Sequence, residues 1–516
     1  MIRKNTRFFL PGCALAVALL AADNSVLMNR YDRFATGANI HETVLNPSNV
    51  NDTSFGKLYS YYVDGAVYAQ PLYRNGVLFV ATMNDKVYAF DATKAGPPLW
   101  LRDLTNELAG VTPVPVSDIT NRNDLNVVGN AGILGTPVID EAQNALFLVA
   151  RTKENGRYVQ RLHKLDLGTG KDKLPPAVIE ASVKSSSVDA VSGDLRFDPR
   201  AGNQRPALAI AKGKVVIAWA SHEDIQPYHG WVMAYDTATL KQAGAFCVTP
   251  DGPEGGIWQS GRGPAIDAEG NIYFETGNGA WDGRRNFGTS VIKLALGAGG
   301  FIVEDYFTPH DWEALNDRDV DLGSTGPLLL PGTDLLLCGN KKGILYLIDS
   351  RHLGKITPAD QGILQAVDVK GGRDLAGPAY WDGPAGPSIY LWTEADFPKA
   401  FRFDGHTLTP VPFAKGSTAA HGSPGGSLTV SADGKKAGTG IVWATVTTRG
   451  SADHGNAPGT LYAFDAETLK ELWNSENKPK RDRLGTLVKF VPPTVINGRV
   501  YVPNYDNAVV VYGTLK

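Results

Sequence analysis

Cysteine is scarce in this chain, and several other features that indicate a particular class of protein are missing. The 516 residues contain 3 cysteines, in no spacing that fits a zinc site or a Cys-x-x-Cys-His haem site. The formal net charge of −3 provides no basic surface for nucleic acid. Beyond the N-terminus, no apolar run approaches the roughly 20 residues of a membrane-spanning helix. We therefore expect no nucleic-acid partner and no membrane span.

Apolar residues and turn formers are plentiful. The hydrophobic fraction is 43% and the charged fraction 20%, which indicates a packed core rather than a disordered chain. The 57 glycines and 32 prolines are scattered, as in a protein of many short strands and turns. Cys247 and Cys338 lie far apart in the sequence; they could pair, but two buried core thiols are the favoured interpretation.

The N-terminus has the pattern of a secretory signal peptide. Arg3, Lys4 and Arg7 precede an apolar run over residues 8–22, and polar residues follow. We expect cleavage after Ala22, a single mature domain over residues 23–516, and a periplasmic or secreted protein.

A unit of four short strands recurs along the chain with a period of about 40 to 60 residues, which is typical of propeller blades. Its third strand ends in Asp, as in YAFDA (88–92), HKLDL (163–167), MAYDT (233–237), YLIDS (346–350) and YAFDA (462–466). The units begin near residues 67, 135, 205, 263, 326, 377, 426 and 491. This spacing predicts an all-β, eight-bladed propeller of four-stranded antiparallel blades in one domain.

The last unit contains only three strands before the chain ends, whereas a spare strand precedes the first unit, near residues 57–63. Pairing these two segments would close the ring and leave no open sheet edge. We therefore expect the N-terminal strand to complete the last blade.

The stretch AFDATKAGPPLW (89–100) resembles the tryptophan-docking repeat of quinoprotein alcohol dehydrogenases, in which an Ala-x-Asp, a Gly and a Trp link neighbouring blades. The copy AFDAETLKELW (463–473) also keeps its Trp. The N-terminal residues 29–58 are likewise similar to the opening of those enzymes. The resemblance covers nearly the whole mature chain, although much of it is blade architecture.

Four further segments resemble the parts of that family that bind pyrroloquinoline quinone and calcium. GGIWQSGRGPAIDAEGNIYFETGNGAWDG (255–283) matches the segment with the Trp beneath the quinone and an Asn that binds calcium, here Trp258 and Asn278. VVIAWASHEDIQPYHGWVMAYDTATL (215–240) resembles the segment that supplies the calcium carboxylate, with Glu223 the nearest match and Asp224 an alternative.

The other two segments follow in the family's order. YFTPHDWEALNDRDVDLGSTGPLLL (306–330) resembles the stretch that carries the catalytic aspartate, with Asp321 the best match and Asp319 the second. CGNKKGILYLID (338–349) is similar to the strand start whose cation contacts the quinone, here Lys341.

This set of residues suits one chemistry. Calcium takes hard oxygen ligands such as carboxylate and amide oxygens, and polarises a quinone carbonyl as a Lewis acid. An aspartate near the substrate hydroxyl removes its proton, while the cofactor supplies the redox step. Each residue also has a simpler interpretation: Asn278 sits between two glycines as turn residues do, and Glu223 with Asp224, or Asp319 with Asp321, could be solvated loop carboxylates.

Some features depart from the family. The mature chain has no adjacent cysteine pair, which in the family contacts the quinone, and the spacing around Trp312 differs. His222 and His229 flank the acidic pair, where a metal site is imaginable, but polar loop histidines are the favoured interpretation.

Two functions compete. The resemblance implies an exported oxidoreductase that oxidises an alcohol, polyol or sugar hydroxyl with pyrroloquinoline quinone and calcium, and passes electrons to a separate acceptor. The alternative is a non-catalytic propeller scaffold that binds a partner protein or polysaccharide. The fold alone does not distinguish them, because propellers serve both purposes. The four segments around Glu223, Trp258, Asp321 and Lys341 occur in the same order as in the family, which favours the enzyme.

Overall fold

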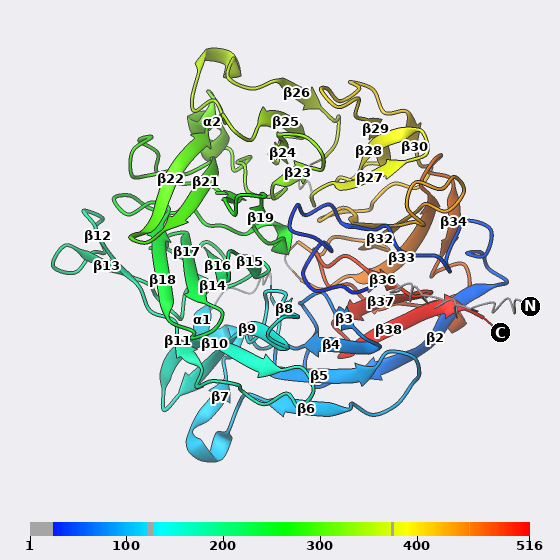
Figure 1. Cartoon of the computed structure of the whole chain (residues 1–516), viewed down its shortest axis with the longest axis horizontal. Helices are drawn as coiled ribbons and strands as arrows, with labels where there is room; N and C mark the ends of the chain where they lie inside the picture. Colours follow the sequence, from blue (N-terminus) through cyan, green and yellow to red (C-terminus); the bar gives the residue numbers. More distant parts are fainter. Residues whose placement is uncertain (1–23, 121–126, 373–375, 454, 516) are drawn as a thin grey trace, which may run out of the picture.

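The repeated units form a ring of four-stranded antiparallel sheets in a computed structural model of the chain (Figure 1). The model describes residues 24–120, 127–372, 376–453 and 455–515. Over these residues the sheets make eight blades, as the sequence predicts. The predicted signal peptide, residues 1–22, lies outside the described part of the chain.

Each of the first four blades contains four consecutive strands, numbered here from the centre of the ring outward. Blade 1 consists of β3 (Leu72–Arg74), β4 (Val77–Ala81), β5 (Lys86–Asp91) and β6 (Trp100–Asp103). Blade 2 consists of β8 (Val138–Asp140), β9 (Ala145–Glu154), β10 (Arg157–Asp166) and β11 (Ala177–Val178), with β7 (Val111–Pro113) added to β9. Blade 3 consists of β15 (Ala209–Ala211), β16 (Lys214–Ser221), β17 (Trp231–Asp236) and β18 (Gln242–Cys247), with β14 (Gly202–Asn203) added to β16. Blade 4 consists of β19 (Ala265–Ile266), β20 (Ile272–Glu275), β21 (Val291–Gly297) and β22 (Gly300–Phe307).

The remaining blades continue the pattern until the chain returns to its start. Blade 5 consists of β23 (Leu328–Leu330), β24 (Leu335–Gly339), β25 (Ile344–Asp349) and β26 (Gln365–Asp368). Blade 6 consists of β27 (Ala379–Gly383), β28 (Gly386–Leu391), β29 (Lys399–Arg402) and β30 (Ala414–Lys415). Blade 7 consists of β31 (Ser427–Ser431), β32 (Ile441–Thr447), β33 (Pro458–Asp465) and β34 (Glu471–Asn474), joined by β1 (Ala38–Asn39) and β35 (Gly485–Thr486). Blade 8 consists of β36 (Thr494–Ile496), β37 (Arg499–Asn504), β38 (Ala508–Thr514) and β2 (Phe55–Tyr62).

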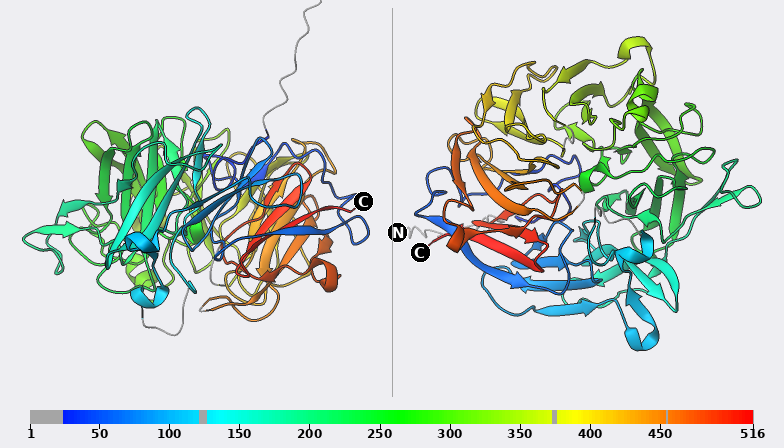
Figure 2. Two further views of the ribbon diagram at one scale, coloured as in Figure 1. Left: turned by 90° about the horizontal axis from the view of Figure 1, so that it is seen from below. Right: turned by 180° about the vertical axis from the view of Figure 1, so that it is seen from behind.

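Little of the described chain lies outside the blades. A hairpin of β12 (Ser182–Lys184) and β13 (Asp194–Arg196) projects from the rim in both views of Figure 2. The α-helices are the short α1 (Val116–Ile119), α2 (Trp312–Asp317) and α3 (Pro479–Asp482). None of the helices in the described ranges combines the length and apolar character needed to cross a bilayer.

Two-residue turns explain several strand reversals. In Asn75-Gly76, Asn155-Gly156 and Asn497-Gly498, both residues have a positive φ, between 48 and 84°. This is the geometry of the tight hairpin turn whose twist matches that of the flanking strands, and Asn-Gly is its preferred sequence. The turn residues therefore fix the register within the blades that contain them.

The N-terminal strand closes the ring. β2 pairs antiparallel with β38, from Phe55 opposite Thr514 to Tyr62 opposite Ala508. This confirms the predicted role of the spare strand, and Figure 1 shows β2 running beside β38 in blade 8. Cys247 and Cys338 are both buried and free, as the core-thiol interpretation expects.

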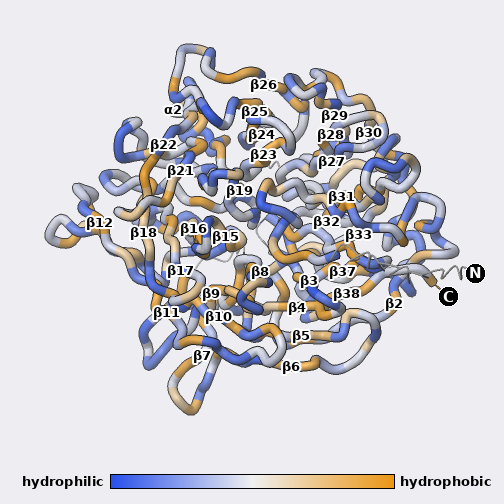
Figure 3. Tube along the Cα trace, viewed as in Figure 1, coloured by the Kyte–Doolittle hydropathy of each residue, from blue (hydrophilic) through white to orange (hydrophobic). Residues whose placement is uncertain are grey.

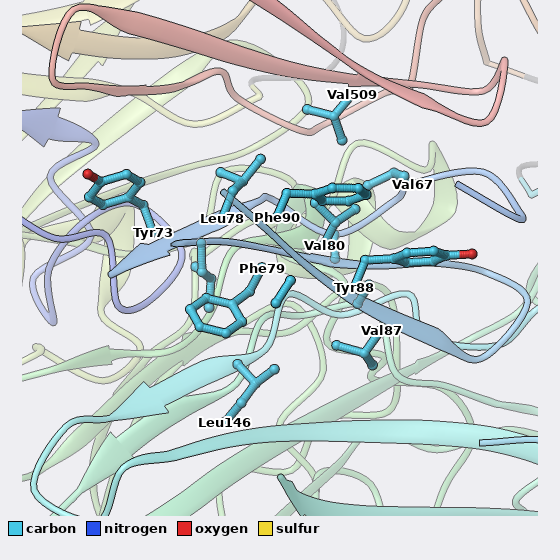
Figure 4. Packing of buried hydrophobic residues seen from close by; sticks show 14 of the residues in the cluster. Val67, Tyr73, Leu78, Phe79, Val80, Val87, Tyr88, Phe90, Leu146 and Val509 are labelled. Carbon is cyan, nitrogen blue, oxygen red and sulfur yellow. The ribbon is translucent and has the colours of Figure 1, made fainter. Parts of the chain in front are cut away.

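The core lies between neighbouring blades rather than within one of them. Figure 4 shows Leu78, Val80 and Phe90 of blade 1 packed together with Leu146 of blade 2 and Val509 of blade 8. In Figure 3 the apolar segments follow the strands, whereas many outer loops are hydrophilic. Burying both faces of each sheet against its neighbours accounts for the strongly apolar inner strands.

The predicted docking of blades by tryptophan is confirmed at Trp100. Its indole Nε1 donates a hydrogen bond to the Leu167 carbonyl of blade 2 at 3.0 Å. The ring covers Gly170, where a Cβ atom would lie 2.5 Å from Cε3 of the indole. Trp473 differs, because its buried Nε1 has no hydrogen-bond partner and its ring packs on Phe55 and Tyr512.

A segment that we call the N-terminal girdle, residues 26–39, lies across the middle of the ring (Figure 1). Its backbone pairs with Tyr73 and accepts backbone hydrogen bonds from residues of the innermost strands of five further blades: Ile139, Ile266, Leu329, Tyr380 and Val430. These contacts lie within the inner strands, whereas the site residues described next precede an innermost strand or follow the second strand of a blade. The girdle therefore links six blades along their innermost strands.

Candidate functional site

Loops from several blades enclose a cavity of about 310 Å³ at the channel mouth. All seven predicted site residues line it: Glu223, Asp224, Trp258, Asn278, Asp319, Asp321 and Lys341. Some of them follow the second strand of a blade (β16, β20 or β24), and the others precede an innermost strand (β19 or β23). The strand ends of three successive blades therefore position all seven. A larger hollow of about 740 Å³ along β10 and β11 is lined by none of the seven.

A network of hydrogen bonds and ion pairs joins four of these side chains. Lys341 Nζ lies 2.8 Å from Asp319 Oδ1 and 3.0 Å from Asp321 Oδ1. The backbone N–H of Asn278 donates to Asp321 Oδ2 at 3.0 Å, and its side-chain Nδ2 donates to Asp319 Oδ1 at 2.8 Å. Asn278 therefore stands fixed between the two aspartates.

The two aspartates have different surroundings. Asp321 is 1% exposed, and burial raises the pKa of its carboxyl to about 6, against the lowering effect of the Lys341 ammonium. The Asp319 side chain is 64% exposed, so water screens its charge. For Lys341, burial alone would lower the pKa, but the carboxylates of Asp321 and Asp319 raise it overall, and the ammonium stays charged.

Trp258 presents a half-buried indole to the cavity. Lys341 Nζ lies 5.5 Å from the centre of its ring, within the range of a cation–π contact. Phe490 packs against it at 5.9 Å between ring centroids, tilted by 67°. The indole is thus held in place and leaves a flat apolar surface for a ligand.

The glycines beside Asn278 are required by close packing rather than by a turn. Neither Gly277 nor Gly279 is among the residues with a positive φ. A Cβ atom on Gly277 would lie 2.8 Å from Asp321 Oδ2, and one on Gly279 would lie 2.5 Å from the Gly255 backbone nitrogen. The simple turn interpretation is therefore insufficient for this stretch.

One atom of Asn278 stands out. Its side-chain Oδ1 is buried, yet it has no hydrogen-bond partner. An unsatisfied buried oxygen costs roughly 1 to 3 kcal/mol, and native proteins rarely leave one without a purpose. An amide oxygen beside carboxylates is a suitable ligand for a hard cation. This feature fits the calcium that the resemblance implies.

The acidic pair has an unusual backbone. Glu223 and Asp224 both have left-handed φ values, 53 and 48°. Consecutive non-glycine residues in this region are strained, and such strain is concentrated at functional sites. Glu223 is 8% exposed, whereas Asp224 is exposed at the rim.

The neighbouring histidines have other partners. Arg151 Nη1 lies 2.6 Å from His222 Nε2, and burial together with Arg151 and Arg205 holds the pKa of His222 well below its usual range. His229 contacts the Thr249 carbonyl and Asp189. Throughout the described ranges, no three His, Cys, Asp or Glu side chains form a metal-binding group by themselves. A cation here would need amide and cofactor oxygens as well.

Sequence reasoning missed several lining residues, among them Arg205, Tyr228, Glu394, Asp453 and Phe490. Most lie in the same loops, before an innermost strand or after the second strand of a blade. The blade repeat could have indicated them, because every predicted site residue lies in the same two kinds of loop. Of these five residues, Tyr228 belongs to a segment chosen for its resemblance, and the other four do not.

Comparisons with known proteins found similarity in sequence over part of the chain and in structure over nearly all of it. No protein-family model matches the chain. Over 261 residues, 41% of this chain, the sequence is 26% identical to the quinohemoprotein alcohol dehydrogenase ADH-IIG of Pseudomonas putida. This match spans 35% of that relative's length.

Solved structures resemble the whole ring. The quinohemoprotein alcohol dehydrogenase of Comamonas testosteroni matches with a TM-score of 0.56 and 15% identity, over 96% of this chain and 81% of that one. A europium-containing methanol dehydrogenase matches with a TM-score of 0.50 and 14% identity, over 93% and 81% of the two chains. The chain is therefore similar to quinoprotein alcohol dehydrogenases in fold and, over part of its length, in sequence.

Proposed function

We propose that this protein is a pyrroloquinoline quinone-dependent oxidoreductase that oxidises the hydroxyl group of an alcohol, polyol or sugar. The observation that carries the proposal is the gathering of all seven predicted residues around one cavity that contains an unsatisfied Asn278 Oδ1. The similarity to quinohemoprotein alcohol dehydrogenases supports the same class of reaction.

The residues present fit the cofactor and a cation. Trp258 offers a flat surface for a planar ring system, and Lys341 lies beside it with a charged ammonium. Asn278 Oδ1 and the Glu223 carboxylate, with Asp224 as an alternative, provide the hard oxygens for calcium. When bound, the quinone supplies the oxidising group, polarised by the cation.

The chain's own task is to hold and move a proton. We assign the general base to Asp321, because its carboxylate is buried, fixed by the Asn278 N–H, and has a pKa near that of an effective base. Asp319 is the weaker candidate, since its side chain is largely exposed. Lys341 contacts both carboxylates, so its ammonium stabilises their charged forms.

Calcium is the cation that we propose, and a trivalent ion is the natural comparison. A europium-containing methanol dehydrogenase is structurally similar to this chain, so we compare calcium with europium. The surplus of carboxylates on the cavity lining would suit a cation of higher charge. The experiment below therefore includes both ions.

Export and an external electron acceptor complete the proposal. The pattern of residues 1–22 supports secretion or a periplasmic location, and the absence of a Cys-x-x-Cys-His sequence calls for a separate acceptor.

The proposal is tested by reconstitution. The purified protein is incubated with pyrroloquinoline quinone and CaCl₂, EuCl₃ or EDTA, and dye-linked oxidation of a panel of alcohols and sugars is measured. We expect turnover that requires both quinone and metal, and that is abolished in Trp258→Ala. A protein that binds no quinone and turns over no substrate would instead be a non-catalytic scaffold.

A further inference from the structure

Glu275 is a buried carboxylate at the end of β20 that the proposed mechanism does not use. It is 0% exposed, and glutamate is rarely buried to this extent unless its oxygens have partners. Its Oε2 accepts hydrogen bonds from the backbone N–H groups of Gly323 at 3.2 Å and Gly326 at 2.9 Å. Both glycines are buried and belong to residues 321–326, which we call the base loop because it begins with Asp321. Glu275 therefore ties the end of β20 to the loop that carries the assigned base.

A second segment holds the carbonyl groups of the base loop. Residues 259, 260 and 262 donate hydrogen bonds to the carbonyl oxygens of residues 323, 324 and 325, at 2.5 to 3.1 Å. The same segment is linked to Glu275, whose N–H donates to Gln259 Oε1 at 2.7 Å. The two sets of contacts are complementary, because one supplies donors to the base loop and the other supplies the acceptor. Without the Glu275 carboxylate, two buried N–H groups would lose that acceptor, which is costly.

The base loop packs directly on the backbone beside Asn278. Gly323 has a φ of 100°, and a Cβ atom added to it would lie 2.9 Å from the Gly277 nitrogen. Two residues before Gly323, Asp321 accepts the Asn278 N–H at its Oδ2, and its carbonyl accepts the Lys341 N–H at 3.1 Å. A shift of Gly323 would therefore move Asp321 relative to both of these partners.

The contact between Glu275 and the base loop depends on acceptor oxygens more than on charge. Burial raises the pKa of Glu275 to about 7, against the lowering effect of the Gly326 N–H and the Arg262 guanidinium. Near neutral pH the carboxyl group is thus divided between its charged and neutral forms, and both forms can accept N–H hydrogen bonds. A glutamine keeps an acceptor oxygen on a side chain of the same length, so it is the conservative substitution here.

We propose that Glu275 is a positioning residue that holds the base loop and so fixes Asp321 relative to the substrate. This inference rests on the proposed function, because it requires Asp321 to be the general base. A base acts only within hydrogen-bond reach of its proton, and a displacement of about 1 Å can lower the rate roughly 100-fold. Glu275 is not among the described residues that line the cavity. Its loss should therefore affect the turnover rate and not the binding of quinone.

Three substitutions of Glu275 and one matched control test this role in the full-length protein. Glu275→Met keeps the length of the side chain and loses both acceptor oxygens. Glu275→Gln keeps an acceptor oxygen, and Glu275→Asp draws the carboxylate back by one carbon. Glu42→Met is the control, because Glu42 is also 0% exposed and accepts backbone N–H bonds, among them that of Gly498 at 3.0 Å, outside the cavity lining. Hydrogen exchange of residues 319–327 is measured in the apo protein, and kcat, KM and quinone affinity in the reconstituted protein.

We expect Glu275→Met to lower kcat by roughly 10- to 100-fold, with KM and quinone affinity within about 3-fold of the wild type. The amides of the base loop should exchange about 10-fold faster or more, since two of them lose their acceptor. Glu275→Gln should stay within about 3-fold of the wild type in kcat. Glu275→Asp should resemble Glu275→Met, and it provides the same test if the methionine variant does not fold. Glu42→Met should leave kcat and the exchange of the base loop unchanged, whatever its melting temperature.

The possible failures are distinguishable. If exchange of the base loop is as slow in Glu275→Met and Glu275→Asp as in the wild type, Glu275 does not hold the loop. If exchange becomes faster and kcat does not change, or if Glu42→Met lowers kcat equally, Glu275 stabilises the fold only. If kcat and quinone affinity fall together, Glu275 shapes the cavity rather than the position of Asp321. If the wild type binds no quinone and turns over no substrate, the proposed function fails, and the role of Glu275 fails with it.

Discussion

At the scale of single residues, the chemistry of the site depends on a few side chains whose surroundings differ from those of ordinary loop residues. Asn278 has the sequence context of a turn residue, yet its flanking glycines allow close packing and its Oδ1 is left without a partner. The resemblance identified Asn278 because a local pattern surrounds it. Arg205 and Phe490 carry no such pattern, and they meet on the cavity wall because the ring brings together blades far apart in sequence.

Asn278→Ala tests the metal ligand. The apo protein should lose no more than about 1 kcal/mol in free energy of unfolding, because the variant removes one exposed hydrogen bond, to Asp319, and keeps the backbone N–H bond to Asp321. Affinity for quinone in CaCl₂ should fall roughly 10- to 100-fold. Asn278→Asp keeps an oxygen and should bind nearly as well. Equal affinity of wild type and Asn278→Ala would show that the amide oxygen is not a ligand.

The two aspartates can be separated by matched substitutions. Asp321→Asn should lower the turnover rate by about 10²- to 10⁴-fold, because an amide cannot accept the substrate proton. Asp319→Asn should have a much smaller effect, because its exposed carboxylate mainly supports Lys341. The measurement is dye-linked turnover of the reconstituted protein at saturating quinone and metal. A larger loss in Asp319→Asn would reverse the assignment.

At the scale of elements, strand pairs and docking contacts follow local sequence closely. The Asn-Gly turns predict hairpins, and the Ala-x-Asp…Trp pattern predicts the contact of Trp100 with the next blade. The same pattern leads to a different contact at Trp473, whose ring packs on Phe55 and Tyr512 of the closing blade rather than on a glycine turn. Trp381 makes an equivalent contact, with the Gly434 carbonyl and against Gly440, from a strand that lacks the pattern.

Gly170→Ala tests whether this docking stabilises the ring. The new Cβ would lie 2.5 Å from the Trp100 indole and would displace it. Gly156→Ala is the matched control, since Gly156 also has a positive φ but no atom lies within 4 Å of its added Cβ. We expect the control to lose about 1 kcal/mol from backbone strain and Gly170→Ala to lose a further 1 to 3 kcal/mol by chemical denaturation. Equal losses would mean that Trp100 docking contributes little.

At the scale of the whole molecule, the eight-bladed ring and its closure by the N-terminal strand could be predicted, because the repeat length and the missing strand are visible in the sequence. The N-terminal girdle could not, since most of its links are backbone hydrogen bonds that any side chain permits. The cavity was predicted only in part for a related reason. A closed ring brings distant loops together, and a local pattern does not reveal which of them meet.

Truncation tests the closure. Removing all residues before Asp64 deletes both β2 and the girdle, and leaves β38 with an unpaired edge. We expect this variant to aggregate or to melt at a much lower temperature, because an exposed edge strand pairs with other chains. Removing residues 1–22 alone should leave the melting temperature unchanged. A soluble truncation before Asp64 with wild-type melting would contradict the closure.

The central claim is that the cavity holds a quinone with a metal ion. Its most direct test is a calorimetric titration of the apo protein with pyrroloquinoline quinone, in CaCl₂ and in EDTA. The account predicts saturable binding of one quinone per chain that is at least about ten-fold tighter with calcium. Absence of binding in both conditions would contradict it. So would a quinone affinity that is the same in CaCl₂ and in EDTA, and the same for the wild type and Asn278→Ala.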